Sequence, residues 1–86
     1  MDTLVYQEWQ AEDVPSGHGD GITYHVFVGT VNWEKIPGHE RTAFVVLMKY
    51  GGVLAYHIPP HILEEDTDAV LGAIARLRAW RESERT

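Results

Sequence analysis

The 86 residues are enough for one domain, and the 44% share of hydrophobic residues is ordinary for a globular protein, so disorder is not expected. The absence of cysteine excludes disulfide bonds and thiol chemistry. The longest apolar run, residues 43–48, is far shorter than the ~20 residues that a membrane span needs. No basic segment followed by an apolar segment begins the chain. We therefore expect no secretory signal, and a cytoplasmic protein without a membrane partner.

The net charge of −6 comes entirely from the N-terminal part of the chain. Residues 1–34 contain six acidic residues and no Lys or Arg, whereas acidic and basic residues balance at seven each from Lys35 onward. An acidic surface repels nucleic acid and anionic lipid, so we expect neither as a direct partner. It suits a basic protein, which it can attract at long range. The alternative is that the acids only keep a small domain soluble.

The N-terminal half is expected to form two strands joined by a long loop. Residues 1–10 should hold the first strand, because residues 4–9 mix β-branched, aromatic and polar side chains. Residues 11–21 should be a glycine-rich loop, since residues 15–21 combine a proline with three glycines. Residues 22–31 alternate as a strand, with Ile22, Tyr24, Val26 and Val28 on one face and Thr23, His25, Phe27 and Gly29 on the other.

A tight hairpin is expected to complete the strands of residues 22–58, after a connection over residues 32–40. Residues 41–50 are rich in β-branched and aromatic side chains, and Gly51–Gly52 suits a two-residue turn with positive φ before residues 53–58. This turn predicts cross-strand pairs of Tyr50 with Val53, Lys49 with Leu54, Met48 with Ala55, Leu47 with Tyr56 and Val46 with His57.

Residues 60–82 are expected to hold a helical segment, because Pro59 and Pro60 end the last strand. Asp66 or Thr67 can cap the helix, and the tail from Glu82 is expected to fray. Its apolar stripe is Val70, Ala73, Ile74, Leu77 and Trp80. The sequence therefore predicts a single α+β domain over residues 1–86, a three- to four-stranded antiparallel meander with one C-terminal helix packed on one face.

The third strand is apolar on both faces, which one helix does not explain. Ala43, Val45 and Leu47 share one face, and Phe44, Val46 and Met48 share the other. The face without the helix can be covered by the loops that carry Val14, Trp33 and Ile36, by a second copy of the chain, or by another protein. We expect Phe44, Val46 and Met48 to form a face for a dimer or a partner, and the pattern leaves open which face the helix covers.

No catalytic, metal-binding or cofactor-binding residues are expected. The Gly17–Gly21 loop lacks the lysine of a P-loop and the spacing of a dinucleotide motif, and its Asp20 repels phosphate. Ser16, His18 and Asp20 lie within five residues, whereas the members of a catalytic triad normally converge from distant segments. His18, Asp20 and His25 can share a metal ion only if the loop folds back onto the strand.

These observations favour a non-enzymatic protein-binding module that occupies a basic partner, such as an inhibitor, an antitoxin-like regulator or a mimic of nucleic-acid charge. The residues expected to contact the partner are Asp2, Glu8, Glu12, Asp13 and Asp20, together with Trp9 and Trp33. In size, acidity and layout the chain is similar in type to small phage-encoded inhibitors of bacterial defence systems, without a shared motif. The alternatives are a metal-dependent enzyme and a homodimeric ligand-binding or enzyme-subunit domain with a pocket lined by Trp9, Tyr24, Trp33 and histidines.

Overall fold

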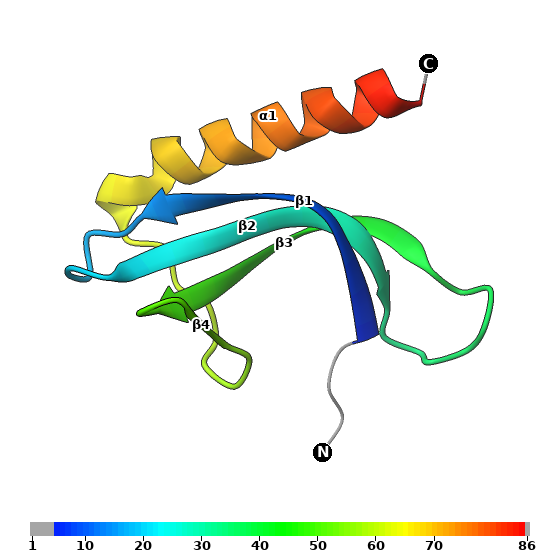
Figure 1. Cartoon of the computed structure of the whole chain (residues 1–86), viewed down its shortest axis with the longest axis horizontal. Helices are drawn as coiled ribbons and strands as arrows, with labels where there is room; N and C mark the ends of the chain where they lie inside the picture. Colours follow the sequence, from blue (N-terminus) through cyan, green and yellow to red (C-terminus); the bar gives the residue numbers. More distant parts are fainter. Residues whose placement is uncertain (1–4, 86) are drawn as a thin grey trace.

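The computed structural model describes residues 5–85, so Asp2 lies outside the described residues. A four-stranded antiparallel sheet in the order β1-β2-β3-β4 carries helix α1 across one face (Figure 1), which confirms the predicted α+β meander. The elements are β1 (Val5–Pro15), β2 (Ile22–Asn32), β3 (Arg41–Tyr50), β4 (Val53–Ala55), the short 3₁₀ helix η1 (Glu64–Asp66) and α1 (Thr67–Glu84). We call the sheet face that carries Tyr24, Val26 and Val28 the helix face, and the face that carries His25 and Phe27 the opposite face.

Strand β1 is longer than the sequence predicts. Residues 11–15 pair with residues 23–27 of β2, so the predicted loop over residues 11–21 is wrong in its first part and shrinks to residues 16–21. Pro15 is tolerated because β1 is an edge strand, where a missing N–H need not cost a ladder bond. Pairing with a distant strand therefore overrides the local preference for a loop.

A β-bulge in β1 places the side chains before it on the sheet face opposite to the one they would occupy in a regular strand. The register shifts between Glu8 and Gln10, and Trp9 is the extra residue. Val14 lies on the helix face, whereas Tyr6 and Glu8, which would share this face in a regular strand, lie on the opposite face. The strand bends sharply in its middle, as Figure 1 shows.

The β3–β4 hairpin has the predicted turn but ends early. Gly51 and Gly52 have φ values of 57° and 85°, and the three predicted pairs next to the turn are present. Strand β4 stops at Ala55, so the prediction of strand residues 56–58 is wrong, as are the pairs of Leu47 with Tyr56 and Val46 with His57. Beyond Ala55 the chain leaves the sheet, and the Tyr56 ring stacks on Tyr6 of β1, with 6.2 Å between the ring centroids.

Helix α1 carries the predicted apolar stripe, but its ends differ from the prediction. Residues 60–63 are not helical and the helix continues to Glu84, so the predicted limits 60–82 are wrong, while the fraying expected from Glu82 stays a prediction. The stripe residues Val70, Ala73 and Leu77 are buried, and Ile74 and Trp80 pack at the margin. Asp66 makes no capping hydrogen bond, because its carboxylate is bonded to Tyr24 of β2.

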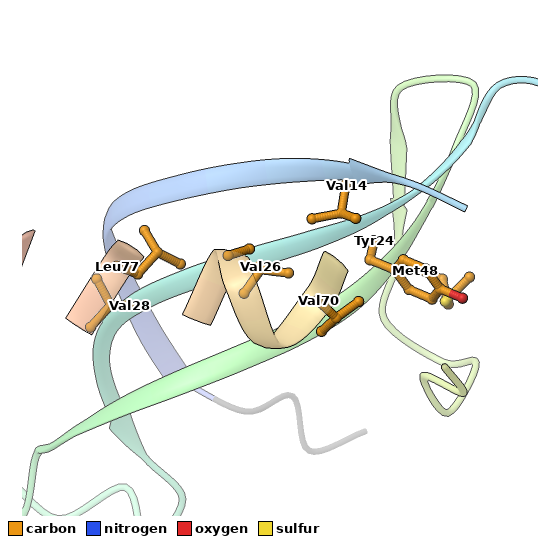
Figure 2. Packing of buried hydrophobic residues seen from close by; sticks show 8 residues of the cluster. Val14, Tyr24, Val26, Val28, Met48, Val70 and Leu77 are labelled. Atoms are coloured by element: carbon orange, nitrogen blue, oxygen red, sulfur yellow. The ribbon is translucent and has the colours of Figure 1, made fainter. Parts of the chain in front are cut away.

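The main hydrophobic core lies between α1 and the helix face (Figure 2). Its buried members are Val14, Tyr24, Val26, Val28 and Met48 from the sheet and Val70, Ala73 and Leu77 from the helix. Phe44, Val46 and Met48 lie on this face, because they pair with Val28, Val26 and Tyr24. The three residues predicted as a dimer or partner face therefore share the face that carries the helix, and their part in an interface stays a prediction. Met48 is fully buried and Val46 packs against the core, while Phe44 is 40% exposed.

Two tyrosines cover part of the opposite face. The centroids of the Tyr6 and Phe27 rings are 4.9 Å apart, and Tyr56 stacks on the Tyr6 ring. Phe27 is thereby fully buried although no helix lies over it. Burial and a hydrogen bond with Tyr56 raise the pKa of Tyr6. The β2–β3 connection, which the sequence suggests as possible cover for the face without the helix, leaves Trp33 and Ile36 exposed instead.

Gly29 permits the close approach of β1 and β2 beside the bulge. A Cβ atom at this position would lie 2.0 Å from the Gln7 carbonyl oxygen, whereas a Cβ atom on Gly72 of α1 would meet only the end of the Arg76 side chain at 3.4 Å. We expect Gly29→Ala to lower the free energy of unfolding by ~2–3 kcal/mol or more. Gly72→Ala should raise it by up to ~1 kcal/mol, since alanine favours a helix. Urea unfolding measures both, and equal effects of the two substitutions would contradict this role of Gly29.

Candidate interaction surfaces

Glu12 joins β1 to the helix. The Arg76 guanidinium donates hydrogen bonds of 2.8, 2.9 and 3.0 Å to the Glu12 carboxylate, and these bonds raise the pKa of Arg76. Further along α1, the Arg81 guanidinium lies 4.8 Å from the centre of the Trp9 ring, a cation–π distance. Glu12 and Trp9, which the sequence predicts as partner contacts, thus hold the sheet and the helix together.

His25 is the centre of a charged network on the opposite face. Its residue surface is 8% exposed, and its ring nitrogens lie 2.6 Å from Glu8 Oε1 and 2.7 Å from Asp13 Oδ1. Lys49 Nζ donates a hydrogen bond of 2.9 Å to Asp13 Oδ2. Because ionised carboxylates only accept hydrogen bonds, the complete network requires a hydrogen on both ring nitrogens of His25. The bulge makes the network possible, since residues five apart lie on opposite faces of a regular strand.

The turn between β1 and β2 is bonded to the start of the helix. Asp66 accepts hydrogen bonds of 2.6 Å from the Tyr24 hydroxyl and 2.9 Å from the Gly17 N–H. These two bonds hold the pKa of Asp66 below its ordinary value. The Tyr24 oxygen accepts a further bond of 3.0 Å from the Leu63 N–H. Residues 16–21 and the start of the helix therefore form one end of the molecule, at the left of Figure 1.

The loop of residues 16–21 brings Ser16 and His18 together. Ser16 Oγ is hydrogen-bonded to His18 Nδ1 and accepts a bond of 3.0 Å from the His18 N–H, a local pattern that stabilises turns. The His18 ring meets the His61 ring edge-on, with 4.7 Å between centroids. Asp20 makes no hydrogen bond to His18 in the described residues. No group of three or more His, Cys, Asp or Glu side chains within residues 5–85 is arranged to hold a metal ion.

Acidic side chains without basic partners gather at this end of the molecule. Asp20, Glu64, Glu65 and Asp68 are exposed, and none of the ion pairs within residues 5–85 includes them. We call these four residues the acidic end. Sequence reasoning predicted a partner contact for Asp20 alone among them, because the helix dipole by itself explains acids at a helix start.

A second exposed surface surrounds the outer edge of β3. Phe44 is 40% exposed beside this edge, and Trp33 and Ile36 in the loop before β3 are 56% and 44% exposed. In the segment after β4, Tyr56 and Ile58 are 49% and 44% exposed. Large apolar side chains that gather around one edge, rather than singly, are typical of an interaction surface.

The aromatic residues considered for an intersubunit pocket do not come together. Tyr24 is fully buried in the core, and Trp9 packs against the core beside Arg81. Trp33 stands in the β2–β3 loop, where the Arg41 guanidinium lies 5.9 Å from its ring centre. These three side chains therefore serve three separate parts of the fold.

Comparisons with known proteins do not indicate a function. The chain matches no family model, no curated protein and no solved structure. No helix in the described part of the chain is long and apolar enough to cross a membrane.

The His25 network predicts that the free energy of unfolding falls at low pH. Burial acts to raise the pKa of the Asp13 carboxyl, but hydrogen bonds from His25 and Lys49 outweigh it and hold this pKa below its ordinary value of 3.8. The bonds therefore stabilise the fold above that pH, and their contribution is lost as the pH falls through the lower folded pKa. We expect Asp13→Asn to lower the free energy of unfolding by ~0.5–1 kcal/mol near neutral pH. The effect is small because the Asp13 side chain is 43% exposed and solvent screens its charge.

Urea unfolding at about pH 7, about pH 5 and about pH 3 measures this dependence. The difference between the wild type and Asp13→Asn should be present at the two higher values and shrink at the lowest. Asp20→Asn is the matched control, because Asp20 is exposed and has no ion pair within residues 5–85. A difference for Asp13→Asn that persists undiminished at the lowest pH would contradict the network.

Proposed function

We propose that the protein is a non-catalytic, cytoplasmic protein-binding module that inhibits a basic partner by occupying its surface. The observation that carries the proposal is the acidic end, where Asp20, Glu64, Glu65 and Asp68 are exposed without basic counter-ions among residues 5–85. Uncompensated charge at one end of a small protein attracts an oppositely charged protein and sets the orientation in which the two meet. The net charge of −6 acts in the same direction at longer range.

Internal bonds hold the acidic end in place, which favours recognition. Asp66 joins the Gly17 backbone to Tyr24, and so ties the β1–β2 turn to the helix start. Carboxylates on a fixed scaffold lose less conformational entropy on binding than carboxylates on a loose loop. A fixed group of carboxylates can also take the place of phosphates in a basic groove. We therefore propose a partner whose basic surface otherwise binds the phosphates of a nucleic acid.

The proposal reassigns the partner contacts that the sequence predicts. Asp20 keeps its predicted role. Glu8, Glu12 and Asp13 are instead engaged in hydrogen bonds to His25, Arg76 and Lys49 within the chain. The acids at the helix start take their place, because their charge is not neutralised by a bonded base within residues 5–85.

Neutralising the acidic end should weaken partner binding. The test variant combines Asp20→Asn, Glu64→Gln, Glu65→Gln and Asp68→Asn, and the matched control combines Glu34→Gln, Glu40→Gln, Glu82→Gln and Glu84→Gln, which removes the same charge elsewhere. We expect roughly tenfold weaker binding for the test variant, because four surface charges at ~0.3–0.5 kcal/mol each sum to about that factor. Its binding should also depend less on salt. The control variant should bind within about twofold of the wild type.

The measurement begins with affinity capture from host extract and identification of the retained protein by mass spectrometry. The partner is then purified, and its complex is characterised by light scattering and by titration at several salt concentrations. Support requires an equimolar complex of the two purified proteins and selective weakening by the test variant. Equal weakening by both variants, or no basic protein retained in stoichiometric amount, would contradict the proposal.

A further inference from the structure

The outer edge of β3 is open for pairing with another strand. Within residues 5–85, β3 pairs with β4 only at residues 48–50, so residues 41–47 present a row of unpaired backbone groups. Residues 42–47 contain no charged residue and no proline. Edge strands of natural sheets normally carry such residues, because they prevent pairing with another chain.

The other edge of the sheet is protected in the usual ways. Strand β1 contains the bulge at Trp9 and ends in Pro15, and it carries the charged residues Glu8, Glu12 and Asp13. Bulges, prolines and charges all disfavour the addition of a further strand. Of the two edges, the β3 edge is therefore the one that suits a strand from outside.

We propose that a second copy of the chain pairs antiparallel with this edge, about a two-fold axis at Phe44, and joins two four-stranded sheets into one continuous sheet. The free edge spans residues 41–47, so its centre is Phe44. The axis sets Phe44 opposite the partner's Phe44, Ala43 opposite the partner's Val45, and Thr42 opposite the partner's Val46. All of these pairs are uncharged, and cross-strand pairs of aromatic and β-branched side chains stabilise a sheet.

The same arrangement covers exposed apolar side chains at both ends of the edge. In this register residue 41 of one copy lies opposite residue 47 of the other. The β2–β3 loop of the first copy, which precedes residue 41, therefore lies near the end of β4 in the second copy. The loop carries the exposed side chains of Trp33 and Ile36, and the segment after β4 carries those of Tyr56 and Ile58. The interface therefore brings the exposed Trp33 and Ile36 of one copy toward the segment after β4 of the other.

Charge favours a second copy over a basic partner at this surface. Residues 35–58 contain three basic residues and one acidic residue, whereas the rest of the chain is strongly acidic. A basic protein would meet charge of its own sign here, whereas residues 42–46, which pair with each other in the two copies, carry no charge. Strand β3 runs toward the acidic end, since the Gly51 N–H after it donates a hydrogen bond of 2.7 Å to the Gly21 carbonyl. Antiparallel pairing therefore sets the two acidic ends far apart, and their repulsion is small.

Size-exclusion chromatography with light scattering, from low micromolar to several hundred micromolar protein, tests the pairing. The wild type should approach twice the chain mass of 9.7 kDa as its concentration rises. Phe44→Glu and Phe44→Lys should each weaken the dimer at least ~tenfold, because the axis sets like charges directly opposite. An equimolar mixture of these two variants should dimerise again. Leu71→Glu is the matched control, since Leu71 is 57% exposed on α1, and it should dimerise like the wild type.

Cross-linking tests the register. The chain contains no cysteine, so Phe44→Cys introduces a single thiol. Residues directly opposite in an antiparallel pair have Cα atoms ~4.5–5.5 Å apart, which a disulfide can bridge. Two thiols should therefore form one disulfide when oxidised glutathione accepts their two electrons and two protons. Leu71→Cys should give little covalent dimer under the same conditions.

Three results would overturn the proposal: a wild-type monomer at every concentration, a dimer that neither charged substitution at Phe44 weakens, or equal cross-linking of the two cysteine variants. Circular dichroism checks that each variant folds, and if Phe44→Glu does not fold, the Phe44→Cys cross-link carries the test. The dimer and the basic-partner complex use different surfaces, so the failure of one leaves the other standing.

Discussion

The extra residue in β1 is the constraint on which both faces of the sheet depend. Because Trp9 interrupts the alternation of the strand, Val14 faces the helix while Tyr6 and Glu8 face away from it. In a regular strand all of them would lie on the helix face, and the opposite face would lose the ring that covers Phe27. The bulge thus lets a single edge strand supply cover to both faces, which one helix cannot do.

The opposite face uses polar contacts where the helix face uses apolar packing. His25 is almost fully buried, and both of its ring nitrogens are bonded to carboxylates of β1. A buried polar group without a partner costs ~1–3 kcal/mol, so any sliding of β1 that separated these atoms would be penalised. A one-residue slip would also turn Glu8 and Asp13 to the other face. The network therefore helps to fix the register of a strand whose bulge could otherwise form at a neighbouring residue.

Features that depend on neighbouring residues could be predicted from the sequence, whereas features that depend on distant residues could not. The apolar stripe of α1 and the Gly51–Gly52 turn are local patterns, and both are present. Strand β4 ends just before Tyr56, whose ring stacks on Tyr6 of a distant strand, a contact that no local pattern records. Asp66 has the position of a helix cap, but its carboxylate is bonded to Tyr24, 42 residues away. The sequence assigned the acidic surface to residues 1–34, but it did not reveal that Arg76 and Lys49, on other elements, pair with Glu12 and Asp13.

The two proposed surfaces support each other through the direction of β3. The strand begins at the loop that carries Trp33 and Ile36, and it ends beside the turn that carries Asp20. Antiparallel pairing of two such strands joins the less acidic parts of two copies and directs their acidic ends outward. A dimer built this way presents two sites for a basic partner, so a partner that is itself a dimer or a repeating assembly would be held with greater avidity than one site provides. The open edge therefore strengthens the proposed inhibition by linking two binding sites without bringing their negative charges together.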